Sequence, residues 1–304
     1  MTLPHESHGV RFITDGGLET TLVFLDGIDL ADFAAFPLLD HDDGRAALRR
    51  YYTPYLELAR ERGAPFVLDT PTWRANPDWG AGLGYAAERL AEVNREAVRF
   101  VAALAREFAD VETVINGVIG PRGDGYVVGA TMTADEAADY HALQATAFAG
   151  AGADMLTGVT MTYSDEAIGV TRAASAAGLP AVVSFTVETD GRLPSQQLLA
   201  DAIAVVDDAT NAGPAYYMIN CAHPTHFMSA LEAGADWTRR IKAVRANASR
   251  LSHAELDEAT ELDRGDIGEL ADLYHELGSV LDLRVVGGCC GTDHEHIAAI
   301  TAAR

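Results

Sequence analysis

The segment AVVSFTVETDGRLPSQQLLADAIAVVDDATNAGPAYYMINC, residues 181–221, contains two short apolar runs separated by a longer amphipathic one. The runs Ala181–Glu188 and Ala215–Cys221 have the length and the β-branched and aromatic content of buried strands. Ser195–Ala212, between them, has apolar residues at helical spacing. A strand, a helix and a second strand in this order predict a βα repeat built on a parallel sheet.

The same alternation extends along the chain in both directions and supplies eight candidate strands. They are Val10–Asp15, Pro65–Thr70, Thr113–Gly120, Asp154–Thr160, Ala181–Glu188, Ala215–Cys221, Ile241–Asn247 and Leu283–Cys289. The helical patterns between them are Gly44–Arg62, Ala86–Phe108, Ala134–Gly150, Ser164–Ala177, Ser195–Ala212 and Ile267–Gly278. Turn residues without periodicity predict loops near Pro37, at 76–83 and at 192–194. Eight evenly spread units favour an α/β fold with a single (β/α)8 barrel domain over residues 1–304, rather than a doubly wound sheet.

The composition is that of a globular protein with a strongly acidic surface. Of the 304 residues 48% are hydrophobic, which is enough for a large core, and the formal net charge is −23. An anionic surface repels phosphate backbones and anionic lipid headgroups. We therefore expect no nucleic acid partner and no membrane partner. The opening residues lack the pattern of a secretory signal, so we expect a cytoplasmic location.

The three cysteines lie where predicted strands end. Cys221 ends the sixth strand, and Cys289 and Cys290 end the eighth in the segment VVGGCCGTDHEH. The βα loops at this rim of a barrel form one pocket, so the three thiols are expected to converge there. Three thiolate ligands and one open position are typical of a catalytic zinc site. We predict that these three cysteines bind Zn²⁺, and a disulfide framework is not expected with so few cysteines.

Other interpretations of this cluster were weighed against a metal site. Buried cysteines are often simply small hydrophobic residues, although strand-end positions favour ligands. A disulfide between Cys289 and Cys290 would close a small strained ring and leave Cys221 unexplained. The nearby histidines are interpreted as loop or helix-start residues rather than as ligands: His223, His294 and His296.

Seven segments of the chain resemble the homocysteine S-methyltransferase family. They are ITDGGLETTL (13–22), LDTPTWRAN (68–76), GVIGPRGDGY (117–126), GAGADML (150–156), SFTVETDGRL (184–193), INCAHP (219–224) and GGCCGTDHEHI (287–297). The NC and GGCCGT motifs are the specific ones. The family includes betaine- and S-methylmethionine-dependent enzymes and the homocysteine module of cobalamin-dependent methionine synthase.

The resemblance implies a zinc-dependent S-methyltransferase on a (β/α)8 barrel. The metal ligands that carry over are Cys221, Cys289 and Cys290. The residues implied to bind the amino acid part of homocysteine are Asp15, Thr70 and Asn220, together with the backbone of Gly16 and Gly17. The reaction implied is methyl transfer from a sulfonium or ammonium donor, such as S-methylmethionine or betaine, to a zinc-bound homocysteine, giving methionine. A separate corrinoid protein is kept as an alternative methyl source.

Two segments depart from the family pattern. The fourth strand of family members usually ends in a glutamate that helps to hold the substrate's amino group, and this sequence has Val159 there. Glu19 and Thr21 stand where the family more often has a small residue and then a glutamate, which is consistent with a relocated carboxylate. Glu166 lies too far into the next helix to replace the missing group. A thiol acceptor without a free amino group is therefore an alternative to homocysteine.

Two further functions are alternatives to methyl transfer. In a zinc hydrolase or demethylase, water would take the open position of the metal, with Glu188 or Asp15 as the candidate general base. In a non-catalytic zinc- or thiol-binding protein, the departures at Val159 and Thr21 would have abolished turnover.

Overall fold

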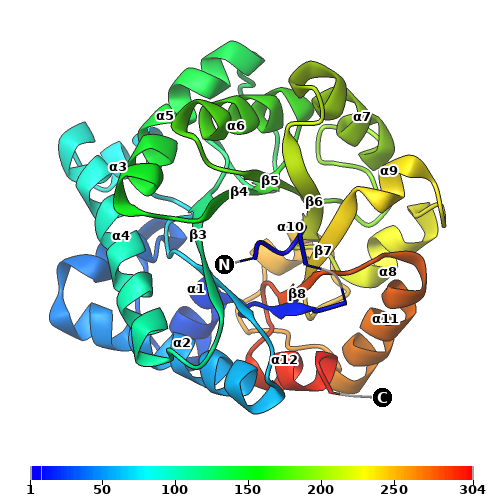
Figure 1. Cartoon of the computed structure of the whole chain (residues 1–304), viewed down its shortest axis with the longest axis horizontal. Coiled ribbons are helices and arrows are strands. Elements are labelled where there is room, and N and C mark those ends of the chain that lie inside the picture. Colours follow the sequence, from blue (N-terminus) through cyan, green and yellow to red (C-terminus); the bar gives the residue numbers. More distant parts are fainter. Residues whose placement is uncertain (1, 8, 303–304) are drawn as a thin grey trace.

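The computed structural model describes residues 2–7 and 9–302 and shows a closed barrel of parallel strands (Figure 1). The strands are β1 (Phe12–Ile13), β2 (Phe66–Asp69), β3 (Thr113–Ile119), β4 (Met155–Met161), β5 (Ala181–Phe185), β6 (Pro214–Asn220), β7 (Ile241–Ala246) and β8 (Val285–Gly288). Each strand pairs with the next in chain order, and β8 pairs with β1, with Phe12 opposite Val285. The predicted (β/α)8 barrel is confirmed.

Helices surround the barrel (Figure 1). The long ones are α2 (Asp42–Arg62), α4 (Ala87–Glu107), α5 (Ala134–Ala151), α6 (Ser164–Ala177), α7 (Leu199–Thr210) and α11 (Ile267–Val280). The shorter ones are α1 (Leu18–Thr20), α3 (Pro77–Gly82), α8 (Pro224–Phe227), α9 (Asp236–Arg239), α10 (His253–Asp257) and α12 (His294–Ile300), together with the single turns η1 (Thr21–Leu25), η2 (Ala31–Phe33), η3 (Phe36–Asp40) and η4 (Met228–Ala230). Three of the six long helices, α5, α6 and α7, follow a strand directly, as in a repeated βα unit, and the other three follow a shorter helix.

Apolar side chains form two layers, because successive residues of a strand point to opposite faces of the sheet. The layer inside the barrel consists of Phe12, Val67, Val114, Met155, Val182, Tyr216, Met218, Ala243 and Val285. The larger layer lies between the strands and the helices. The N-terminal segment covers the end where the strands begin, since Leu3 packs on the inner layer and the ring of His5 lies 6.2 Å from that of Tyr216. The opposite end, where the strands finish, is left for the site.

Three predicted segments differ from the structure for local reasons. Residues 76–83 were expected to form a loop, but they contain α3, because the Asn76 side chain accepts a hydrogen bond from the Trp79 amide and Pro77 starts the helix. The predicted loop at Pro37 is the short helix η3. The helix expected from Ser195 begins only at Leu199, because Gln196 has a φ of 68° and breaks the pattern.

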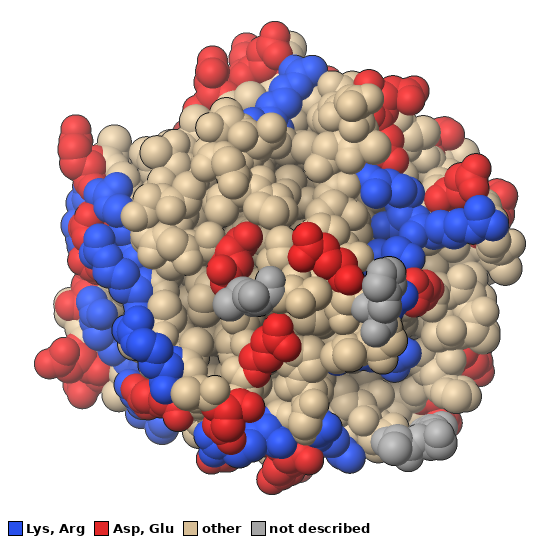
Figure 2. All heavy atoms as spheres, in the orientation of Figure 1, with Lys and Arg blue, Asp and Glu red and all other residues tan. Residues whose placement is uncertain are grey.

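Most Lys and Arg side chains lie in ion pairs, while the acidic groups outnumber them and give the net charge of −23. Figure 2 shows Lys and Arg side chains running along the left edge of the molecule, over α4, with acidic groups beside them. Ion pairs there include Arg99 with Glu92 at 2.8 Å and Arg89 with Glu96 at 3.0 Å. Among the described residues, no helix combines the length and the apolar character needed to cross a membrane.

Candidate active site

The three cysteines meet at the end of the barrel where the strands finish. Cys221 follows β6, Cys289 and Cys290 follow β8, and their sulfur atoms all lie within 4.8 Å of one another. In the described part of the chain, this is the one group of three or more cysteine, histidine or acidic side chains that could hold a metal ion, and it consists of cysteines alone. The structure therefore brings together the three predicted metal ligands.

The backbone around Cys221 is fixed by several hydrogen bonds. Cys221 has a φ of 54°, a left-handed conformation that few side chains adopt. Its carbonyl accepts hydrogen bonds from His253 Nε2 at 2.5 Å and from Asn247 Nδ2 at 3.1 Å. These contacts offset the cost of the unusual conformation and direct the thiol toward β8.

Glycines shape the turn that carries the other two sulfurs. Gly291 has a φ of 79°, and a Cβ placed on it would lie 2.5 Å from the carbonyl oxygen of Asp263. A Cβ on Gly288 would lie 2.0 Å from Thr292 Oγ1. Thr292 itself donates to the carbonyl of Cys289 at 2.7 Å. The GGCCGT motif thus encodes a sharp bend that lets two consecutive cysteines face one point.

Cys221 and Cys289 are joined by a disulfide, and Cys290 is a free thiol. This differs from the expectation that all three thiols are reduced. The physical reason is their convergence, because sulfurs close enough to share one metal ion are also close enough to bond to each other. A tetrahedral ion with bonds of about 2.3 Å to sulfur needs ligand sulfurs about 3.8 Å apart, which this spacing allows once the disulfide is reduced.

Tyr126, from the loop after β3, covers the sulfurs. Its hydroxyl lies 3.4 Å from Cys221 Sγ and 3.8 Å from Cys290 Sγ, and its ring packs against His253 with the centroids 4.4 Å apart. Burial, followed by the effect of Cys290, raises the pKa of Tyr126 well above its usual value. The hydroxyl therefore stays protonated at neutral pH and can donate to sulfur.

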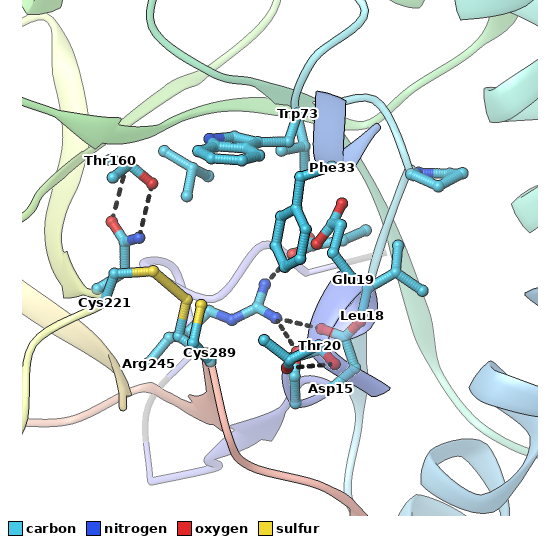
Figure 3. A pocket seen from close by; sticks show the side chains of 18 of the residues that line it. Asp15, Leu18, Glu19, Thr20, Phe33, Trp73, Thr160, Cys221, Arg245 and Cys289 are labelled. Carbon is cyan, nitrogen blue, oxygen red and sulfur yellow. Dashed lines mark hydrogen bonds and ion pairs between the residues drawn. A yellow bond between two sulfur atoms is a disulfide. The ribbon is translucent and has the colours of Figure 1, made fainter. Parts of the chain in front are cut away.

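A cavity of about 80 Å³ lies beside the sulfurs, and every residue predicted to touch substrate or metal lines it (Figure 3). These residues are Asp15, Gly16, Gly17, Thr70, Asn220, Cys221, Cys289 and Cys290. Other side chains of the lining are Glu19, Phe33, Asp69, Trp73, Tyr126, Val159 and Arg245. The placement of the predicted residues is thus as expected, while their contacts with substrate stay predictions.

Asp15 is not a free carboxylate, because buried Arg245 on β7 binds it. The guanidinium forms ion pairs with both Asp15 and Asp69, and it also donates to the carbonyl of Gly288 at 2.9 Å (Figure 3). Asp15 accepts a further hydrogen bond from the hydroxyl of Tyr51 at 3.0 Å. Burial lowers the pKa of Arg245, but the two carboxylates outweigh it and raise the pKa above its usual value, so the group stays charged.

The other two predicted polar contacts are also occupied within the protein. Asn220 accepts from the Thr160 amide at 3.0 Å and donates to Thr160 Oγ1 at 3.0 Å. Thr70 Oγ1 lies 2.7 Å from Thr72 Oγ1 and accepts from the Val118 amide at 2.9 Å. Both residues therefore fix the shape of the rim.

Glu19, at the start of α1, is different. Its side chain is partly exposed and lines the cavity, and apart from its own backbone amide its carboxylate has no hydrogen-bond or ion-pair partner among the described residues. Burial raises the pKa of this carboxyl to about 7, with a smaller contribution from Asp15. Val159 lines the same cavity and brings no charge.

The acidic residues weighed for other roles are held elsewhere. Glu188 contacts His253 Nδ1 at 3.1 Å and does not line the cavity, so it is not placed as a general base. Glu166 is buried, contacts His141 at 3.0 Å and accepts from the Arg122 amide at 2.7 Å, away from the sulfurs. As predicted from the sequence, Glu166 is too far away to replace a carboxylate at the position of Val159.

Sequence reasoning missed two important residues of the cavity. Arg245 carried a signal, since a charged residue inside a buried strand needs a partner of opposite charge. Tyr126 ends the family-like segment GVIGPRGDGY, but its contact with the sulfurs could not be predicted because the path of this loop across the rim depends on the whole fold. The histidines interpreted as structural behave in that way: His296, for example, contacts Asp293 at 2.8 Å.

Comparison with known proteins gives a consistent result. The family model described as homocysteine S-methyltransferase matches residues 12–304. No curated protein sequence matches the chain. The homocysteine methyltransferase MmuM from Escherichia coli, in its oxidized form, is 21% identical with a TM-score of 0.75, over 95% of this chain and 94% of that chain. Its metallated form is 21% identical with a TM-score of 0.73, over 95% of each chain.

At this level of identity the similarity to the solved structures establishes the shared barrel. The family match, in contrast, spans almost the whole chain and includes all three cysteines of the cluster. The chain belongs to the homocysteine S-methyltransferase family and is a methyltransferase.

Proposed function

We propose that this protein is a zinc-dependent enzyme that methylates the thiol of homocysteine, giving methionine, with a small sulfonium or ammonium compound as the methyl donor. The observation that carries the proposal is the convergence of Cys221, Cys289 and Cys290 beside a cavity, in a chain of this family. The similar Escherichia coli homocysteine methyltransferase MmuM has been solved in a metallated form, which supports a metal in this protein. We also propose that residues 1–304 form one domain that works in the cytoplasm.

The three thiolates would hold the zinc ion, because sulfur ligands suit it and the cluster leaves one side open to the cavity. Bound there, zinc would lower the pKa of a substrate thiol and keep its sulfur anionic and nucleophilic at neutral pH. Burial raises the pKa of the free Cys290 thiol to about 11, so a nearby positive charge is needed to keep it ionised.

The chemical step balances without an oxidant or reductant. The acceptor thiol gives its proton to solvent, its sulfur forms a bond to the donor's methyl carbon, and the bond from that carbon to the donor's sulfonium or ammonium atom breaks. The donor leaves as a neutral thioether or tertiary amine with the electron pair. The protein's own part is to orient the acceptor, which Tyr126 and the rigid rim around Asn220 can do by shaping the cavity.

The test is methionine formation by the reduced, zinc-loaded protein from homocysteine with S-methylmethionine or with betaine. We expect turnover with one of these donors and background rates for Cys290→Ser. Turnover only with a methylated corrinoid protein would move the methyl source to that alternative. Hydrolysis of the donor without methionine formation would contradict the proposal and favour water as the acceptor.

A further inference from the structure

We propose that Glu19 binds the ammonium group of the thiol substrate, so that the acceptor is an aminothiol held by sulfur at one end and by nitrogen at the other. This inference rests on the proposed function, since it concerns the acceptor of that same site. It concerns a position that departs from the family pattern, and it follows from the charges around the cavity.

The carboxylates of the cavity differ in what they already bind. The lining has three acidic side chains, Asp15, Glu19 and Asp69, and one arginine, Arg245. Arg245 forms ion pairs with both aspartates, whereas Glu19 has no ion-pair or hydrogen-bond partner among the side chains that the structure describes. A partly buried carboxylate without a partner is destabilised, and a cation that enters the cavity reduces that cost. Glu19 is therefore the acidic group available to a ligand.

The position of Glu19 suits an elongated ligand. Figure 3 shows the sulfur atoms on one side of the cavity and Glu19 with Phe33 on the other, and Arg245 lies between them. A molecule whose thiol reaches the cysteines therefore directs its far end toward Glu19. Arg245 cannot bind a cation, and Val159, which also lines the cavity, has no charge.

The kind of cation follows from the hydrogen-bonding capacity of the carboxylate. A primary ammonium has three N–H donors and gains from an oxygen acceptor, which Glu19 supplies. A quaternary ammonium or sulfonium donor has no N–H group and is better placed against aromatic faces. Such faces line the adjoining cavity, which contains Phe24, Trp73 and Tyr126. The two substrates are thus sorted by chemistry, the ammonium to Glu19 and the methyl donor to the aromatic side chains.

Arg74 is the other cation near Glu19, and it is engaged elsewhere. Its guanidinium lies 4.2 Å from the ring centroid of Trp73 and 3.8 Å from that of Trp79, and it donates to the carbonyl of Gly123 at 3.3 Å. It lowers the pKa of Glu19 only as a minor effect at a distance. Glu19 therefore keeps its hydrogen-bonding capacity for a ligand.

The test compares two thiols in two proteins by isothermal titration calorimetry. The thiols are homocysteine and 4-sulfanylbutanoate, which lacks only the amino group, and the proteins are the reduced, zinc-loaded wild type and Glu19→Gln. We expect the wild type to bind homocysteine at least about 10-fold more tightly than 4-sulfanylbutanoate, the factor that a charge-assisted hydrogen bond supplies. Glu19→Gln should lose this preference through weaker binding of homocysteine alone. Glu61→Gln, an exposed glutamate of α2, is the matched control and should bind both thiols as the wild type does.

Three outcomes would overturn the inference. They are equal binding of both thiols by the wild type, an equal loss for both thiols in Glu19→Gln, and no loss in that variant. Calorimetry measures binding without turnover. Failure of methyl transfer would therefore contradict the proposed function, while the calorimetric comparison would still decide whether Glu19 binds the ammonium group. Binding of neither thiol to the zinc-loaded wild type would contradict both.

Discussion

The two sides of the cavity satisfy their polar groups in opposite ways. The sulfur wall is formed by Cys221, Cys289 and Cys290, of which the first two form a disulfide, and its contact with another side chain is the Tyr126 hydroxyl beside Cys221 and Cys290. The polar wall, formed by Asp15, Glu19, Asp69 and Arg245, is held together by ion pairs inside the protein. Once the disulfide is reduced, three converging thiols can bind a metal ion, whereas a wall of paired charges keeps its shape with or without a ligand.

Glu19 is the exception within the polar wall. Its three companions form one ion-paired group, and its own carboxylate is left open to the cavity. This contrast indicates that the paired and unpaired groups have different roles. The paired groups set the geometry of the rim, and we propose that the reduced sulfurs on one side and Glu19 on the other bind the ligands.

The largest stability effect is expected from Arg245→Met, which breaks the polar wall. The variant leaves Asp15 and Asp69 as adjacent buried charges, and removal of one partner from a buried ion pair costs about 3–5 kcal/mol. Urea unfolding of the reduced protein measures the loss. Adding Asp15→Asn and Asp69→Asn to Arg245→Met should recover most of it.

The matched control for that prediction is an exposed ion pair. Arg239 contacts Asp236 at 2.8 Å on the surface, and Arg239→Met should change the free energy of unfolding by no more than about 0.5 kcal/mol. Equal effects of Arg245→Met and Arg239→Met would show that the polar wall is not an ion-paired unit.

A smaller effect is expected from Gly291→Ala, which deforms the sulfur wall. The added Cβ would meet the carbonyl of Asp263 in a left-handed conformation, so we expect a loss of about 1–3 kcal/mol in unfolding free energy together with weaker zinc retention. Gly150→Ala is the control, because a Cβ at this position of α5 meets no atom within 4 Å. Unchanged stability and zinc content in Gly291→Ala would contradict the role given to the glycine-flanked turn.

The smallest effect is expected from Asp293→Ala, beneath the sulfur wall at the start of α12. Asp293 accepts from the Glu295 amide at 3.0 Å, and loss of such a helix cap costs about 1–2 kcal/mol. Burial raises the pKa of Asp293, but His296 and Arg264 lower it by more, so that the pKa is about 2 instead of the ordinary 3.8. The stabilisation is therefore present above about pH 4 and is lost as the pH falls toward 2.

Unfolding measured between pH 5 and pH 2.5 checks this dependence. Wild type should lose more stability over that range than Asp293→Asn, which keeps a capping oxygen but has no carboxylate to protonate. Parallel pH curves for the two proteins would show that the charge of Asp293 contributes nothing.

The sulfur wall could be predicted from sequence because its information is local. Strand ends before Cys221 and Cys289 place the thiols at one rim, and the glycines beside them mark the turn. The polar wall could not, because it depends on side chains from β7, from β2 and from the end of β1 meeting in one cavity, and β7 pairs with neither of the other two strands. The strand positions of Asp15 and Asp69 place them at the rim, but their ion pairs with Arg245 of β7 depend on the tertiary structure.

The same distinction holds for the fold. Ser164–Ala177 was predicted with the bounds that α6 has, since its start signal and apolar spacing are both local. The strand predicted at Val10–Asp15 is only Phe12–Ile13 in the structure. Its length is set by pairing with β2 and β8, and the local sequence does not indicate where that pairing ends. Segments defined by their own residues were thus easier to predict than those limited by neighbours.

The most direct test of the central claim counts thiols and zinc in the same sample. We predict that the fully reduced protein takes up one zinc ion per chain and that all three cysteines then resist a thiol reagent. The oxidised protein should take up none and show one reactive thiol, Cys290. A reduced protein that binds no zinc, or a Cys290→Ser variant that binds it as tightly as the wild type, would contradict the account.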